Sequence, residues 1–342
     1  MKRTRLWQWW SGIVVWTMAL CLVGFSLPDD EEAFFQLGGT IDIHEDQLVY
    51  TVDSPELKQS GIYMFDLETK EVVQLTEEAP SEQHTQPVVS ADGTQMAYLV
   101  TTQGNENEPP ASLIELMHLE SKQVRTITAR DVLVTSIAFA PESDVLYYSK
   151  AKTFDNYSPI AKKAPHDLNI FRYSLGEKTH TQMTDENHYS MSDLSVSLDG
   201  SELYFSTFDG TAQSLMKVET EAPSTQTRIA PIDKKDIYSP EFSPNGELVA
   251  FTRPANLGEN DPLYEYELFT MDMDTRQVEQ RTSLGTNVHE LVFANDDAYV
   301  YFVENKGFGS YEPRFAYYRY DLENNQLEPI DINSHMSTGS RI

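Results

Sequence analysis

Three histidines occupy comparable places in the chain, and histidine is the side chain best suited to acid–base chemistry and metal binding near neutral pH. His84, His188 and His289 each lie about seven to eleven residues before an acidic residue in a short polar turn. Three imidazoles on one face could hold a divalent metal ion. Their unequal offsets leave a second interpretation open, in which each histidine is a hydrogen-bonded structural residue.

The chain lacks the sequence motifs of several enzyme classes. It has no G-x-S-x-G nucleophile motif and no Walker phosphate-binding loop. His44-Glu45 and His289-Glu290 begin like the zinc motif H-E-x-x-H, but neither is followed by the second histidine. We therefore expect a protein that is not an enzyme and needs no cofactor. A metal-dependent lyase or hydrolase that uses the three histidines is the alternative.

A recurring phrase follows the histidines and predicts a tight turn between two strands. Residues Tyr238–Thr252 read YSPEFSPNGELVAFT, and Asn245-Gly246 supplies the positive φ angles that a hairpin turn requires. The run after the turn is apolar on both faces, as expected for a strand buried on both sides. The other copies are Gln86–Val100, Ile137–Ser149, Leu194–Ser206, Leu291–Val303 and, most weakly, Ile41–Val52.

A second hairpin follows each copy of this phrase. In the copy that starts at Glu267, ELFTM reads as a strand and DMDTR as a polar turn. The six second hairpins begin at Ile62, Ile114, Asn169, Ser214, Glu267 and Phe315. Two hairpins make one four-stranded antiparallel sheet, which is too small to bury its own faces. Six such sheets in one chain predict an all-β, six-bladed β-propeller of four-stranded antiparallel blades.

The phrase FSPNG…VAF…LFTMDMDT resembles the WD-repeat-like units of the TolB-like six-bladed propeller superfamily. The resemblance covers nearly all of the chain after the leader. It implies the fold and not the function, because that superfamily includes binding modules, regulatory propellers of prolyl-oligopeptidase-type enzymes and a few lyases. Some of those lyases hold a metal with a histidine cluster near the channel mouth, and the resemblance carries that role to His84, His188 and His289. The hydrolase domain of the peptidases has no counterpart here.

The first 27 residues differ in composition from the rest. Lys2, Arg3 and Arg5 precede Leu6–Leu27, which has no charged residue, so a signal peptide or a retained signal-anchor helix is expected. The basic leader should stay in the cytoplasm and the domain should lie outside it, membrane-anchored or secreted. Whether the leader is cleaved stays open. Residues 28–39 are expected to be an acidic tether and a closing strand or docking segment, 40–332 the propeller, and 333–342 a flexible tail.

Charge and cysteine usage fit an extracytoplasmic location. The chain has a net charge of −29, and the leader contains none of its acidic residues. So acidic a domain excludes nucleic acid as a partner, because nucleic-acid binding requires a basic surface. Cys21 in the leader is the only cysteine, so the domain has no disulfide and depends on its apolar core.

The predicted ligand-binding residues lie on long connections between strands. In an up-and-down blade, the connections between second and third strands share one face, and long loops on a rigid scaffold often carry function. The long connections are Thr101–Ser112, Ala151–Leu168, Arg253–Glu265 and Glu304–Arg314. The predicted binding residues are Tyr157, Lys162, Lys163, Tyr264 and Tyr311. We expect a protein or cell-envelope ligand there; a purely structural or sensory ectodomain is a further alternative.

Overall fold

The structure, a computed structural model, divides the chain into two compact units, Met1–Phe34 and Phe35–Ile342. It describes residues 35–54, 57–77, 79, 81–102, 111–129, 133–156, 163–208, 213–255, 265–294, 297–310 and 312–335. The predicted leader helix therefore lies outside the described residues. Within the described ranges, no helix is both long and apolar enough to cross a membrane.

The described residues form six consecutive four-stranded units. Units 1 and 2 are β1 (Gln36–His44), β2 (Gln47–Ser54), β3 (Gln59–Asp66) and β4 (Val72–Gln74), then β5 (Glu82–Val89), β6 (Gln95–Thr102), β7 (Ala111–His118) and β8 (Val124–Thr126). Units 3 and 4 are β9 (Leu133–Phe139), β10 (Val145–Asn156), β11 (Lys163–Ser174) and β12 (Thr179–Gln182), then β13 (Ser192–Val196), β14 (Glu202–Phe208), β15 (Gln213–Glu219) and β16 (Gln226–Ile229). Units 5 and 6 are β17 (Tyr238–Phe242), β18 (Leu248–Pro254), β19 (Tyr266–Asp272) and β20 (Val278–Gln280), then β21 (Asn287–Phe293), β22 (Tyr299–Asn305), β23 (Phe315–Asp321) and β24 (Gln326–Ile330).

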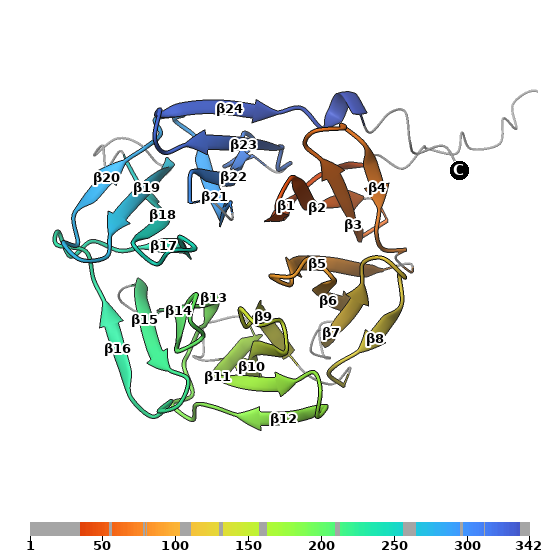
Figure 1. Cartoon of the computed structure of the whole chain (residues 1–342), viewed down its shortest axis with the longest axis vertical. Helices are drawn as coiled ribbons and strands as arrows, with labels where there is room; N and C mark the ends of the chain where they lie inside the picture. The colour runs from red at the N-terminus through yellow and green to blue at the C-terminus, as the bar shows by residue number, and fades with distance from the viewer. Residues whose placement is uncertain are drawn as a thin grey trace, which may run out of the picture. The chain divides into compact units, whose positions relative to one another are not determined.

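Pairing within each unit is antiparallel between successive strands. Single parallel pairs, Ser60 with Gln83 and Tyr266 with Asn287, join units 1 and 2 and units 5 and 6 into larger sheets. The units are arranged radially around an axis, with the first strand of each unit nearest the centre (Figure 1). Each first strand contacts the next one, and β21 contacts β1. The predicted all-β architecture of four-stranded antiparallel sheets is confirmed.

The recurring phrase forms the turn that the sequence predicts. In unit 2, the Ser90 hydroxyl donates to Asp92 Oδ1 at 2.6 Å, and Gly93 adopts φ +67°. The Ser90 hydroxyl oxygen also accepts the Gln95 amide at 3.0 Å, which ties the two sides of the turn together. Units 4 and 5 repeat this arrangement at Ser197–Gly200 and Ser243–Gly246.

The apolar core lies between neighbouring units. Tyr204 of unit 4 stacks on Phe242 of unit 5 with ring centroids 3.7 Å apart, and both belong to the cluster around Phe251. Five large or apolar residues from copies of the recurring phrase are all buried: Phe139, Tyr204, Phe205, Ala250 and Phe251. The buried clusters draw only on residues between Leu37 and Ile332. The second compact unit therefore contains its own core and can fold as a domain.

Among the described residues, the ring is not closed by the strand that the sequence predicts within residues 28–39. The expected closing strand includes Gln36 and Leu37, but these residues pair with Asp53 and Val52 of β2 in unit 1. Ala33 and Phe34, which begin that segment, lie outside the described residues. The seam is closed by side chains, because Tyr317 of unit 6 donates its hydroxyl to the Gly38 carbonyl at 3.0 Å.

The C-terminal segment completes this seam. Ile332 follows the last strand and is fully buried in the same cluster as Leu37 and Phe65 of unit 1. His335, in the short helical turn after it, has its ring 5.7 Å from that of Phe65. Residues 333–335 of the predicted tail belong to this turn, and residues 336–342 lie outside the described part.

Candidate functional site

The two ends of the propeller axis differ in the length of their connections. At the first-turn end, first strands pass to second strands through short turns such as residues 45–46 and 90–94. At the opposite end, second strands pass to third strands through connections that include residues 103–110, 157–162 and 255–265. We call this the long-connection end. Antiparallel pairing places these connections together, as the sequence predicts.

Most of the Ala151–Leu168 segment is a β-hairpin and not the loop that the sequence predicts. Strands β10 and β11 have twelve residues each, and their pairing continues to Asn156 and Lys163. Asp167 adopts φ +58°, and its carboxylate accepts the Thr153 hydroxyl at 2.7 Å, which fastens the two strands to each other. The prediction of a loop was wrong because the residues that pair here are mostly charged or polar, so they show no apolar pattern typical of strands. The hairpin extends unit 3 at the long-connection end.

Exposed apolar side chains gather at the same end. Phe35 precedes β1, Leu57 lies between β2 and β3, Phe208 ends β14, and Phe308 lies between β22 and β23. All four side chains are exposed to solvent. Large apolar groups on a soluble surface often mark a contact site for another molecule. This end therefore presents aromatic and aliphatic groups from four positions of the chain.

The predicted ligand-binding residues fall mainly outside the described part. Tyr157, Lys162, Tyr264 and Tyr311 belong to connections that the structure does not describe. Lys163 is the first residue of β11 and is exposed, opposite Asn156 in the hairpin. It lies at the long-connection end, and its role in ligand binding stays a prediction.

The three histidines each contact an aromatic ring of their own unit. His84 lies 5.3 Å from the Tyr98 ring, His188 lies 5.3 Å from Phe205, and His289 lies 5.5 Å from Phe315. Burial lowers the pKa of His84 and of His289, so both are neutral at pH 7. His188 shares a hydrogen bond of 2.9 Å with Gln226 Oε1. Among the described residues, no three His, Cys, Asp or Glu side chains are grouped so that they could hold a metal ion.

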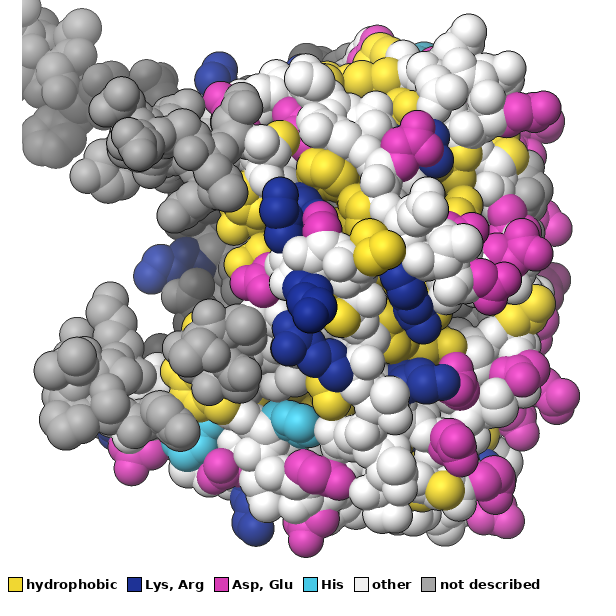
Figure 2. Space-filling model, turned by 90° about the vertical axis from the view of Figure 1, so that its left-hand side faces the viewer, with side chains coloured by type: hydrophobic (Ala, Val, Ile, Leu, Met, Phe, Trp, Pro, Cys, Tyr) yellow, Lys and Arg dark blue, Asp and Glu magenta, His cyan; other side chains and the backbone are white. Residues whose placement is uncertain are grey.

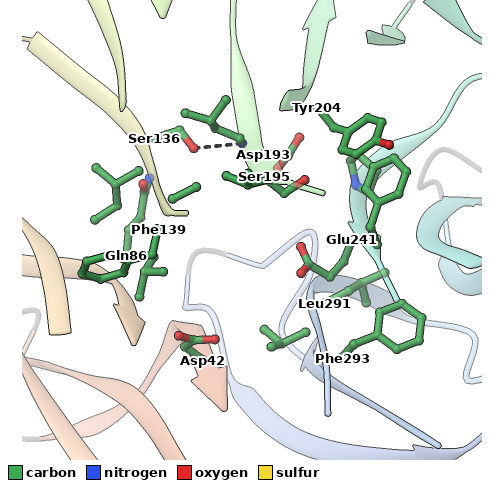
Figure 3. Close-up of a pocket in the computed structure, with 18 of the residues that line it drawn as sticks. Asp42, Gln86, Ser136, Phe139, Asp193, Ser195, Tyr204, Glu241, Leu291 and Phe293 are labelled. Carbon is green, nitrogen blue, oxygen red and sulfur yellow. Dashed lines mark hydrogen bonds between the residues drawn. The ribbon is translucent and has the colours of Figure 1, made fainter. Parts of the chain in front are cut away.

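A cavity of about 470 Å³ lies among the first strands, and sequence reasoning missed it. Four carboxylates line it: Asp42 on β1, Asp193 on β13, Glu241 on β17 and Glu290 on β21. Gln86 and Ser136 come from the two remaining first strands (Figure 3). The lining continues to turn residues such as Leu198 and Pro244, so the cavity extends toward the first-turn end.

Irregular backbone positions turn several of these side chains inward. Gln86, Asp193 and Glu290 adopt left-handed conformations with φ of 49°, 53° and 49°, and each coincides with a break in the register between first and second strands. Such bulges re-aim one side chain, and they often occur beside functional sites. Asp42 and Glu241 reach the cavity from regularly paired positions nearer the first turn.

The pKa of each of the four cavity carboxylates is raised above its usual value. Burial raises the pKa of Asp42 to about 7, although hydrogen bonds from the Val89 and Ile43 amides oppose this shift. Burial and repulsion from Asp193 and Asp42 raise the pKa of Glu290 to about 8. The pKa of Glu241 is raised well above its usual value by burial and by its three acidic neighbours, and burial also raises that of Asp193.

Comparison with solved structures shows the same fold. TolB from Acinetobacter baumannii superposes with a TM-score of 0.62 over 84% of this chain and 64% of that one, at 14% identity. The chain has a TolB-like β-propeller fold. Oligogalacturonate lyase from Vibrio parahaemolyticus gives a TM-score of 0.57 over 87% of this chain and 79% of that one, at 13% identity. A chain of the nidogen/laminin complex gives 0.57 over 80% and 91%, at 9% identity.

These identities show the fold alone, and the chain spans 64% of the length of the A. baumannii TolB. No protein-family model and no curated protein sequence matches the chain. The TolB-like propeller nevertheless has two features with defined chemistry. Its long-connection end offers apolar groups, and its axial cavity offers carboxyl groups that can exchange protons near pH 7 and attract cations.

Proposed function

We propose that this protein is an exported, six-bladed TolB-like propeller, membrane-tethered or secreted, that binds a protein or cell-envelope ligand without catalysis. The ligand binds at the long-connection end. The observation that carries the proposal is that Phe35, Leu57, Phe208 and Phe308, from units 1, 4 and 6, are exposed at that end of the axis, the end at which the β10–β11 hairpin also extends. Phe208 is held by β14, and the other three groups lie next to strand ends, which limits the entropic cost of binding. Exposed Lys163 on the hairpin supplies a cationic contact in a strongly acidic domain.

Export is supported by the sequence features of the leader and by the composition of the domain. When protease is added to intact spheroplasts, we expect digestion of the domain while a cytoplasmic marker survives. Full protection of the domain in intact spheroplasts, with digestion after lysis, would refute the proposed location.

Site-specific crosslinking tests the proposed binding end. A photoreactive amino acid at Phe208 or Leu57 should yield a discrete crosslinked adduct in intact cells. The same amino acid at Leu198 provides the matched control, because Leu198 is 65% exposed but lies at the first-turn end. We expect no adduct from the Leu198 position. An adduct from Leu198 and none from the other two would assign binding to the opposite end.

Substitutions then measure the contribution of this end to affinity. The double variant Phe308→Ser, Lys163→Glu should bind the ligand identified by crosslinking with an affinity about tenfold or more lower. Aromatic and cationic groups often dominate the binding energy of an interface. The melting temperature should change little, since both side chains are exposed. The expected loss is smaller in high salt, where the lysine contact is screened. Unchanged capture would contradict the proposed end.

The metal-dependent lyase or hydrolase stays an alternative prediction of the sequence. His84 and His289 lie in units 2 and 6, and His188 lies in the connection between units 3 and 4; each is beside an aromatic ring. Nothing in their described surroundings favours that alternative over the binding function.

A further inference from the structure

An exposed isoleucine is held on a locked turn at the outer side of units 4 and 5. Ile232, in the connection between β16 and β17, has a side chain that is 67% exposed. The Lys234 amide donates to the Pro231 carbonyl at 3.0 Å, and the Ile232 amide donates to the Arg276 carbonyl at 3.0 Å. Pro231 is buried, so the turn is anchored to the body of the domain on both sides of the isoleucine.

An ion pair between a buried arginine and a partly exposed aspartate holds the same turn in place. The Arg253 guanidinium donates to Asp233 Oδ2 at 2.6 Å, and the Arg253 side chain is almost fully buried. Its guanidinium carbon lies 4.8 Å from the centre of the Phe251 ring. The turn therefore cannot fold Ile232 back into the core without breaking backbone hydrogen bonds and this ion pair. These bonds keep a large apolar side chain exposed to solvent, a feature that often marks a contact site for another molecule.

Cations surround this isoleucine. Arg228 on β16 and Lys234 and Lys235 in the connection are all exposed, and Arg276 lies at the turn that bonds to Ile232. Figure 2 shows the side that carries β16 and β20: Lys and Arg side chains gather around apolar groups in its middle, whereas Asp and Glu dominate toward one edge. Asp233 is paired with Arg253, and Asp236 is the other acidic residue of the connection. This basic patch is notable in a chain of net charge −29.

We propose that this basic patch, consisting of Arg228, Ile232, Lys234, Lys235 and Arg276, docks on the phosphate headgroups of an anionic bilayer. Ile232 is a single apolar group among cations, whereas protein interfaces usually present a larger apolar core inside a polar rim. A bilayer interface accepts a protruding side chain, and each nearby cation adds about 1 kcal/mol of attraction to an anionic surface. Acidic groups elsewhere are screened beyond about 8 Å at physiological salt.

Docking of this kind is weak for a free domain and useful for a tethered one. A tether raises the effective concentration of the patch at the surface and makes a weak contact persist. The contact would set which side of the propeller faces the membrane. The inference rests on the proposed membrane-tethered location, but its test does not depend on the ligand of the long-connection end.

The test uses residues 35–342, which contain the whole described core, carrying an N-terminal hexahistidine tag bound to nickel-chelating lipid. Vesicles of phosphatidylcholine with and without one-third phosphatidylglycerol provide the two surfaces. Hydrogen exchange of residues 228–236 is the readout. We expect at least about threefold slower exchange on the anionic vesicles than on the neutral ones, and less protection as salt rises.

Three variants make the outcome decisive. Lys234→Glu with Lys235→Glu should abolish the protection, and Ile232→Ser should reduce it. Leu198→Ser removes an equally exposed apolar side chain from the first-turn end and should leave it unchanged. The proposal would be overturned if residues 228–236 exchange equally fast on both kinds of vesicle. It would also be overturned if Leu198→Ser reduces the protection as much as Ile232→Ser does. The two proposals can fail separately. If the Phe208 position gives no crosslink but residues 228–236 are still protected on anionic vesicles, the proposed ligand site is refuted and this inference stands.

Discussion

Replacing Ile332 by aspartate should open the ring and lower the melting temperature by about 10 °C or more, because it buries an unpaired charge in a domain of this size. Ile332 is fully buried against unit 1, where it packs in one cluster with Leu37 and Phe65. Thermal unfolding followed by circular dichroism measures the change. Ile332→Val should cost only about 1 kcal/mol, since it removes a single buried methylene.

Leu327→Asp provides the matched control for this prediction. Leu327 lies on the neighbouring strand β24 and is partly exposed, so the same new charge reaches water there. We expect its melting temperature to stay within a few degrees of the unchanged protein. Equal losses for the two aspartate variants, or none for either, would show that Ile332 does not close the ring.

The second large effect is a stability gain on removing a cavity carboxylate at alkaline pH. Burial raises the pKa of Glu290 from 4.5 to about 8. A carboxyl group with a raised pKa in the folded state stabilises the fold below its unfolded pKa. That contribution is lost as pH rises through the folded pKa. We therefore expect Glu290→Gln to be more stable than the unchanged protein at pH 8.5, by on the order of 2–4 kcal/mol.

Urea unfolding between pH 4.5 and 8.5 measures this difference. The gain should shrink as pH falls and become small near pH 4.5, where the folded-state carboxyl group is protonated and the unfolded-state group is about half protonated. Asp42→Asn should show the same trend over a narrower range, because the pKa of Asp42 rises only to about 7. Glu323→Gln, in an exposed turn, is the control and should change the free energy of unfolding little, since its side chain is exposed. A gain that is constant with pH would contradict the proposed electrostatic origin.

The fold could be predicted because its signals are local. Ser90, Asp92 and Gly93 fix a turn through bonds among themselves, and the apolar run after them has to be buried on both faces. Six repeats of such a unit leave radial packing as the natural solution. Only the outer part of the β10–β11 hairpin, within Ala151–Leu168, was predicted as a loop, because its paired residues are mostly polar and no apolar alternation marked them as strands.

The candidate site could not be read from the sequence, because neighbouring residues point in different directions. His289 attracted attention by its chemistry, but it packs against Phe315 within its own unit. Glu290, the next residue, is turned to the axis by a left-handed backbone position. Its partners Asp42 and Asp193 come from strands far away in the chain, and only the closed ring brings them together. The left-handed conformation itself has no signature in the residue type, since Glu rarely adopts it.

The seam between units 1 and 6 determines when the domain can complete its folding. Each of these units has four strands of its own, and none of the described strands is exchanged between them. During synthesis from the N-terminus, units can therefore form one after another as they emerge. Leu37 and Phe65, however, cannot be buried completely until Ile332 has been synthesised. Ile332 follows every described strand of the propeller in the chain. Until then the nascent chain is an open arc with an apolar face at its first edge. That face is where aggregation would begin and where a chaperone would bind.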